Sequence, residues 1–261
     1  MKHLNQFITE YIINKKLDKP IDSEHNYKYF PTTRQELFKI TQELIDKGQY
    51  DLNCINTESI TDMNNLFVKV TDIDISGWDV SNVKNMRNMF INCENFNCDL
   101  SNWDVYNVED MTNMFYDCEK FEGKGLDKWN VNSVKITEFM FIKCDKFDCD
   151  LSNWNVSKVE NMQNMFQDCK NFKGKGLDKW NVSNVKYMSS IFKNCEKFDC
   201  DVSNWNICNV IYMDYAFINC LSFTGKGLDK WNPQSLKDSE GIFDNCKSIK
   251  KYPKWYTHWF K

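Results

Sequence analysis

A tryptophan recurs through most of this 261-residue chain at an almost fixed interval, and this period restricts the fold more than any other feature. The spacings between successive members alternate between 25 and 26 residues. Self-similarity at a period of about 20 to 50 residues is typical of a stacked array, in which each repeat buries its apolar face against its neighbours. The seven tryptophans are Trp78, Trp103, Trp129, Trp154, Trp180, Trp205 and Trp231.

Two further columns follow the tryptophans at constant distances, and we expect all three columns to form the core. A phenylalanine stands twelve residues after each tryptophan, at Phe90, Phe115, Phe141, Phe166, Phe192, Phe217 and Phe243. A cysteine follows three residues later, at Cys93, Cys118, Cys144, Cys169, Cys195, Cys220 and Cys246. Extending the frame backward places Ile55 and Phe67 in a degenerate first repeat, so residues 51–249 are predicted to form eight repeats of about 25 residues.

The repeats come in two alternating kinds, so the full period is 51 residues. One kind carries CDLSNW or CDVSNW before the next tryptophan, and the other carries GKGLDKW with one extra residue. The paired glycines predict a bulge or wider turn, because glycine adopts backbone angles that other residues avoid.

Within one repeat, the apolar spacing predicts a short helical or 3₁₀ segment beginning near Val83. Val83, Met86, Phe90 and Cys93 recur at separations of three and four, and Ser81 just before them is a candidate N-cap, as is the neighbouring Asn82. The segment CDLSNWDV has alternating apolar positions and predicts a short strand. One strand and one helix per repeat predict a right-handed α/β solenoid.

The string AFINCLSF at residues 216–223 and the recurring W-D/N-V-S-N-V-x-x-M-x-x-M-F-x-x-C-x-x-F resemble a known family. They are similar to the BspA-like leucine-rich repeats of bacterial surface proteins, in the mycoplasma-type variant, over residues 51–249. The resemblance implies a leucine-rich-repeat-type solenoid. It also implies adhesion and the recognition of a host or partner molecule.

The two ends have no such period and are predicted to be caps. Residues 1–50 contain an amphipathic segment, Leu4 to Leu17, and a second one in which Thr33 and Glu36 form a capping-box pattern before a stop at Gly48. We interpret residues 1–50 as a helical N-terminal cap and docking region. Residues 250–261 form an aromatic C-terminal cap, expected to cover the last repeat or, alternatively, to anchor a partner. Its aromatic residues are Trp255, Tyr256, Trp259 and Phe260.

None of the candidate motifs has the residues that catalysis, metal binding or cofactor binding requires. The column cysteines occupy apolar places of the repeat and are predicted to be buried thiols rather than disulfides or zinc ligands, since the three histidines are isolated. The calcium-loop-like DIDISG at residues 72–77 has Val83 where a bidentate glutamate is needed. Each GKG lacks the upstream glycine spacing and the following Ser or Thr of a phosphate loop. We therefore predict a protein that is not an enzyme and that has no cofactor.

Charge and hydropathy restrict the partners and the location. The 33 basic and 37 acidic residues give a net charge of -4 without a long basic run, which disfavours nucleic acid. Neither a signal peptide nor an apolar run of about 18 residues is found, so membrane insertion is not expected. We expect the chain to be cytoplasmic at synthesis, with reduced thiols, and open to later assembly into a virion or a surface structure.

The residue before each tryptophan alternates between asparagine and lysine. These residues are predicted to form a polar stripe along the stack, which is either a solvated face or a partner-binding surface. The function favoured by the sequence is non-catalytic recognition or adhesion through the repeat surface, with a protein or glycan as partner. The alternative is a structural component of a virus particle, such as a phage, or of a surface assembly. The stripe consists of Asn102, Lys128, Asn153, Lys179, Asn204 and Lys230.

Overall fold

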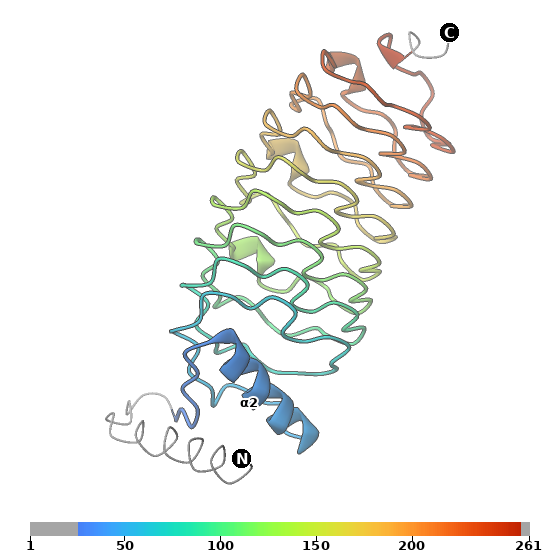
Figure 1. Ribbon diagram of the computed structural model, residues 1–261. Coiled ribbons are helices and arrows are strands. Elements are labelled where there is room, and N and C mark those ends of the chain that lie inside the picture. The colour runs from blue at the N-terminus through green and yellow to red at the C-terminus, as the bar shows by residue number, and fades with distance from the viewer. Residues whose placement is uncertain (1–25, 257–261) are drawn as a thin grey trace.

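The computed structural model describes residues 26–256, in which successive repeats lie one above another in an elongated stack (Figure 1). A 13-residue helix, α2 (Arg34–Asp46), lies at the N-terminal end of the stack. Three 3₁₀ helices recur along it: η1 (Leu126–Lys128), η2 (Leu177–Lys179) and η3 (Leu228–Lys230). Between residues 26 and 256 the β-structure consists of isolated parallel bridges rather than extended strands.

Parallel bridges join each repeat to the next at one column of the stack. The column runs Asp62, Asn85, Asp110, Ile136, Asn161, Tyr187, Tyr212 and Asp238. Alternate backbone N–H groups beyond each bridge continue the contact: Met86 donates to the Asp110 carbonyl at 3.0 Å, and Asn88 donates to the Thr112 carbonyl at 2.9 Å. We call residues 85–92 and their equivalents the ladder. In the ladder, backbone N–H groups of one repeat donate to backbone carbonyls of the next. A repeat on its own would leave these groups without partners, so each repeat needs its neighbour.

The helix expected near Val83 is wrong, because this segment is the ladder and is built from consecutive β-turns. The N–H groups of Met89, Ile91 and Cys93 bond to the carbonyls three residues before them, while those of Phe90 and Asn92 bond to the next repeat. Asn88 and Asn92 have φ of +55° and +59°, which interrupts a right-handed helix and suits the third position of a type II turn. Asn82 is not an N-cap either: its side-chain amide donates to the Glu58 carbonyl of the preceding repeat.

The strand expected at CDLSNW is a turn as well. The Trp103 N–H bonds to the Leu100 carbonyl at 3.2 Å, and Ser101 lies at the corner. Its N–H bonds to the Asp99 carboxylate at 3.0 Å, which is an Asx-turn. The wider turn expected from GKG is present: Gly123 and Gly125 have φ of +84° and +92°, and η1 follows directly.

The phenylalanine and tryptophan columns run inside the stack. Consecutive phenylalanines from Phe67 to Phe243 have ring centroids 5.4 to 5.8 Å apart. Trp103, Trp129, Trp154 and Trp180 stack at 6.2 to 6.4 Å. All seven tryptophans of the repeat column, from Trp78 to Trp231, are buried. Each indole N–H donates to a backbone carbonyl of the preceding repeat at 2.7 to 3.2 Å. Each tryptophan of the column is therefore fixed by both packing and a hydrogen bond, and each phenylalanine by packing.

The cysteine column is buried and has a specific bonding role. Each thiol lies 2.9 to 3.2 Å from the backbone carbonyl of the phenylalanine in the preceding repeat. Desolvation raises the pKa of these thiols; that of Cys93 is raised to about 12. The column therefore consists of protonated thiols that donate a weak hydrogen bond between repeats.

Different structures cover the two ends of the stack. Thr33 caps α2 through a 3.2 Å bond from the Glu36 N–H, while the Glu36 carboxylate accepts from the Thr32 N–H, one residue before the one expected. Leu37 and Leu44 of α2 are buried, and the Arg34 Nε donates to the Asn64 carbonyl of the first repeat at 2.6 Å.

At the C-terminal end, Trp255 continues the tryptophan column, 6.1 Å from Trp231, and its indole N–H reaches the Leu228 carbonyl. Tyr256 packs edge-on against Phe243, so these two residues cover the last repeat. The predicted segment Leu4 to Leu17 and the aromatic residues Trp259 and Phe260 lie outside the described residues.

Candidate interaction surface

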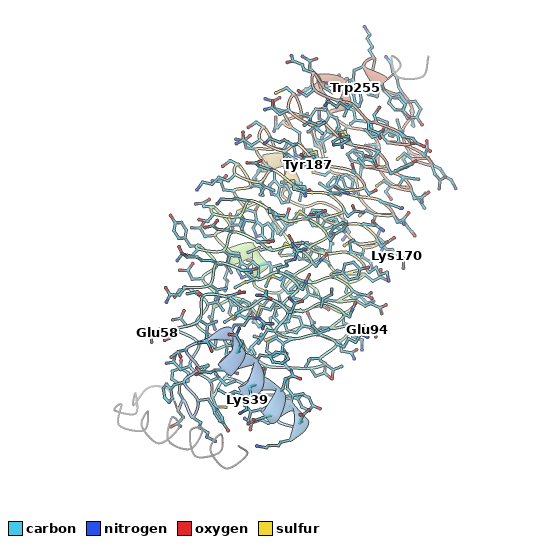
Figure 2. All side chains as sticks on the ribbon, viewed as in Figure 1. Lys39, Glu58, Glu94, Lys170, Tyr187 and Trp255 are labelled. Atoms are coloured by element: carbon cyan, nitrogen blue, oxygen red, sulfur yellow. The ribbon has the colours of Figure 1, made fainter. Side chains whose placement is uncertain are left out.

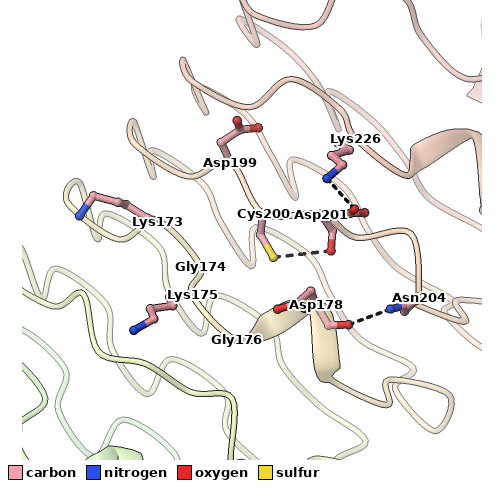
Figure 3. Close-up of a pocket in the computed structure, with 10 residues that line it drawn as sticks. All are labelled: Lys173, Gly174, Lys175, Gly176, Asp178, Asp199, Cys200, Asp201, Asn204 and Lys226. Atoms are coloured by element: carbon pink, nitrogen blue, oxygen red, sulfur yellow. Dashed lines mark hydrogen bonds and ion pairs between the residues drawn. The ribbon is translucent and has the colours of Figure 1, made fainter.

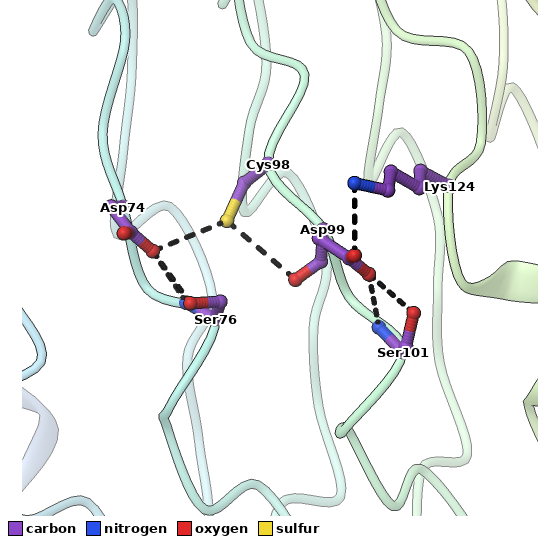
Figure 4. Close-up of polar contacts among 6 residues, drawn as sticks. All are labelled: Asp74, Ser76, Cys98, Asp99, Ser101 and Lys124. Atoms are coloured by element: carbon purple, nitrogen blue, oxygen red, sulfur yellow. Dashed lines mark hydrogen bonds and ion pairs between the residues drawn. The ribbon is translucent and has the colours of Figure 1, made fainter.

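A charged pair joins each GKG loop to the repeat before it. The Lys124 Nζ lies 3.0 Å from the Asp99 Oδ2, and the same pair recurs two and four repeats later at 2.9 Å, as Lys175 with Asp150 and Lys226 with Asp201. In the first pair, Ser101 donates both its N–H and its hydroxyl to the Asp99 carboxylate (Figure 4). The two alternating repeat kinds therefore supply opposite halves of one unit.

These contacts stabilise the ionised carboxylates. Bonds from Ser101 and Lys124 lower the pKa of Asp99 to about 2. Lysine and serine contacts likewise lower the pKa of Asp150 and of Asp201 to about 2. Because the lysines are largely exposed, the pairs contribute little to folding, but they hold both charges in fixed places on the surface.

An open groove of about 400 Å³ lies between the second and third of these units (Figure 3). Lys173 and Lys175 line one side, and Lys226 and Asp201 line the other. Gly174 and Gly176 leave its floor without side chains. A ligand in this groove would meet charged and polar groups of three consecutive repeats.

Most polar side chains of the groove have partners, with one exception. The Asn204 amide donates to the backbone carbonyl of Asp178 at 3.2 Å, as the equivalent Asn153 does to that of Asp127 at 2.9 Å. The Thr224 hydroxyl donates to the Asp199 carboxylate. The half-buried carboxylate of Asp178 has no hydrogen-bond partner among residues 26–256. It is therefore an acceptor that a ligand hydroxyl or amine can use.

Cys200, which lines the groove, and its equivalents Cys98 and Cys149 in other repeats are poor nucleophiles. Burial raises the pKa of Cys98 to about 11 and those of Cys149 and Cys200 to about 12. They stay protonated near neutral pH, whereas the thiolate is the reactive form. Over the described part of the chain, no three His, Cys, Asp or Glu side chains are arranged to hold a metal ion.

The predicted polar stripe is exposed along its whole length. All six residues, Asn102, Lys128, Asn153, Lys179, Asn204 and Lys230, have exposed side chains directly before the buried tryptophan column. Asn204 brings the stripe to the edge of the groove. The lysines and aspartates of the groove were missed from the sequence, although their alternation every 51 residues was a usable signal.

Each helix of the described residues is too short or too polar to cross a membrane.

The repeats match a known protein family over most of the chain. Residues 33–152 and residues 137–256 each match the family model described as "Mycoplasma protein of unknown function, DUF285". No curated protein and no solved structure matches the chain. The similarity expected to a mycoplasma-type repeat family is thereby shown, in two copies.

Proposed function

The chain belongs to the family of Mycoplasma proteins of unknown function, DUF285, and on that premise we propose that it is a non-catalytic recognition module whose repeat surface binds a protein or glycan. We further propose a repeat solenoid of the BspA-like kind as its fold class. One observation carries the functional proposal: the Lys–Asp unit recurs every second repeat, and an open groove lies between two of these units.

The chemistry of the groove favours an extended polar ligand. Lysine ammonium groups, a free carboxylate at Asp178 and the stripe residue Asn204 offer donors and acceptors side by side. Units of the same chemistry are two repeats apart, so a ligand with its own regular period can engage several at once, and each added contact raises the overall affinity. Polysaccharides and extended peptides both have such periods.

The proposal is tested with a double variant, Lys175→Ala with Lys226→Ala, which removes two groove cations. The matched control is Lys135→Ala with Lys186→Ala, which removes the same charge from pairs with Glu109 and Glu160 elsewhere on the repeat. Wild type and variants are compared on a glycan array and against surface-extracted proteins, after melting curves establish that each is folded.

We expect the groove variant to lose at least tenfold in affinity for any ligand that the wild type binds, and the control to change less than twofold. Equal losses in both variants would refute the groove as the binding site. Sedimentation of native extracts adds a second readout: stoichiometric recovery with particles would favour a structural component instead of a recognition module.

A further inference from the structure

The bridge column of the ladder carries aromatic side chains in two consecutive repeats. It holds Asn85, Asp110, Ile136 and Asn161, and then Tyr187 and Tyr212. Their rings stack with centroids 6.0 Å apart and an interplanar angle of 9°, yet the residues remain 37% and 40% exposed. Stacked aromatic rings that stay in contact with solvent exceed what the ladder needs, because asparagine makes the same bridge.

A third tyrosine beside them is held in a conformation that side chains of its size rarely adopt. Tyr215 has φ of +56°, at a place of the repeat where most earlier repeats have asparagine, such as Asn88, and where Phe139 and Ser190 also have a positive φ. The next repeat has Gly241 there, and a Cβ on it would lie 2.6 Å from the Tyr215 ring. Glycine thus leaves room for the ring, and backbone strain of this kind is concentrated at functional sites.

Three carboxylates lie near Tyr215. The Tyr215 hydroxyl bonds to Glu240, which raises the pKa of the tyrosine to about 12, with Asp214 and Asp238 adding to the effect. In the neighbouring column, the charges that alternate from Lys84 to Lys186 are interrupted by Ile211, where an acidic residue would continue the series. We call Tyr187, Tyr212 and Tyr215, with these three carboxylates, the tyrosine patch; Figure 2 places Tyr187 in the C-terminal half of the stack.

We propose that the tyrosine patch binds an extended arginine-containing segment of a partner protein. A guanidinium group is attracted to the face of an aromatic ring and pairs with a carboxylate through parallel hydrogen bonds. Both groups are present here within one ladder segment, since Tyr212, Asp214 and Tyr215 lie within four residues. The proposal does not depend on the groove of the Lys–Asp units.

Arginine is favoured over lysine by the same geometry. Its planar guanidinium can stack on a ring and donate to a carboxylate at the same time, whereas an ammonium group is a compact and strongly hydrated charge. Lys186 is already held by Glu160 at 2.7 Å, so it does not neutralise the patch. Lys237, the neighbour of Asp238 in sequence, sets one limit of the acidic area.

The probe is a fluorescein-labelled octapeptide of alternating arginine and glycine, titrated into the full chain and followed by fluorescence anisotropy. A peptide with citrulline in place of arginine keeps the shape and removes the charge. We expect saturable binding of the arginine peptide and at least tenfold weaker binding of the citrulline peptide. Absence of saturable binding by the wild type would overturn the proposal.

Two variant pairs separate the aromatic contribution from the apolar one. Tyr187→Leu with Tyr212→Leu keeps apolar area and removes the ring faces, while Tyr187→Phe with Tyr212→Phe keeps the rings. We expect at least tenfold weaker binding for the leucine pair and less than threefold for the phenylalanine pair, which also reports on whether the ladder tolerates substitution. Equal affinity of the leucine pair and the wild type would refute the proposal.

The acidic contribution has its own control. Asp238→Asn with Glu240→Gln removes two charges beside the rings, and Glu94→Gln with Glu119→Gln removes two exposed charges from other columns of the stack. The first pair should weaken binding at least tenfold and the second less than twofold. Equal weakening by both pairs would show attraction to net charge alone and overturn the proposal. Variants of Lys175 and Lys226 should leave this binding unchanged, so its outcome is independent of the groove.

Discussion

Gly176 and its equivalents Gly125 and Gly227 are the positions where a single methyl group should disrupt the stack most. The φ of Gly176 is +90°, and a Cβ placed on this residue would lie 2.2 Å from the backbone nitrogen of Ser152 in the preceding repeat. Gly48 after α2 also has a positive φ, +76°, but a Cβ there meets nothing within 4 Å. Gly176→Ala and Gly48→Ala therefore share the conformational cost, and only the first adds a steric one.

The difference can be estimated from the two contributions. Forcing an alanine to a positive φ costs about 1 to 2 kcal/mol at either site. At Gly176 the repeats must also separate by more than 1 Å to reach ordinary contact, which disturbs the 3.0 Å bond from the Leu151 N–H to the Lys175 carbonyl. Overpacking and a weakened hydrogen bond add about 2 to 3 kcal/mol. We expect a total loss of about 4 kcal/mol at Gly176.

The measurement is urea unfolding followed by tryptophan fluorescence, since the buried tryptophan column reports directly on stacking. Repeat arrays do not always unfold in one step, so the midpoint and the slope are both compared with the wild type. Gly48→Ala should lower the free energy of unfolding by about 1 kcal/mol. If the two variants were destabilised equally, the close approach of the GKG loop to the preceding repeat would not be what requires glycine.

Three further changes test other parts of the stack. The column thiols should not react with a thiol reagent in the folded chain and should all react in denaturant, because burial keeps them protonated; rapid labelling of all twelve cysteines without denaturant would contradict this. The pKa values of Asp99, Asp150 and Asp201 are about 2 when folded, against an ordinary 3.8. Their stabilising contribution, which is small at these exposed pairs, is therefore complete above about pH 4 and lost as the pH falls toward 2. Changing all three to Asn should remove a correspondingly small part of the fall in melting temperature over that pH range. Arg34→Ala should speed hydrogen exchange in the first repeat while leaving that around Phe217 unchanged, and uniform acceleration would contradict a local capping role.

The interior was predictable because the same kinds of side chain recur at the same places in every repeat. A side chain that recurs once per repeat must face its own copies, so Trp129 is expected to meet Trp154, and the two rings stack at 6.4 Å. The paired glycines also predicted the wider turn, because two glycines with one residue between them favour a turn in the backbone. Neither inference required knowledge of how the rest of the chain is folded.

The local conformation was not predictable from the same pattern. Apolar residues at Met86, Met89, Phe90 and Cys93 fit one face of a helix, but they equally fit the inner corners of consecutive turns. Periodicity states which side chains point inward and leaves open where the backbone N–H groups go. Here alternate N–H groups bond to carbonyls of the next repeat. This pattern depends on the stacked neighbour, so the sequence of a single repeat does not reveal it.

The Lys–Asp units were missed for a related reason. Lys175 and Asp150 are 25 residues apart in sequence, and each alone resembles a solvated surface residue. They become a pair only when the two alternating repeat kinds are superposed in register. Reading the 51-residue period as a surface pattern as well as a backbone pattern would have brought them together.

Asparagine shows how one residue type can serve the turn and the stack together. Asn88 takes the positive φ that its turn requires, and its side chain links the repeats: its amide donates to Asn65 at 3.0 Å, and its oxygen accepts from Asn113 at 2.8 Å. Replacing such a residue loses both the tolerated backbone angle and the side-chain link. At Tyr215 the repeat gives up both and keeps a strained aromatic ring over Gly241 instead. Phe139 has the same place with φ of +59°, so the stack accepts an aromatic ring there. Tyr215 differs from it in the hydroxyl that bonds to Glu240, and the arginine peptide tests whether this pair serves a contact outside the chain.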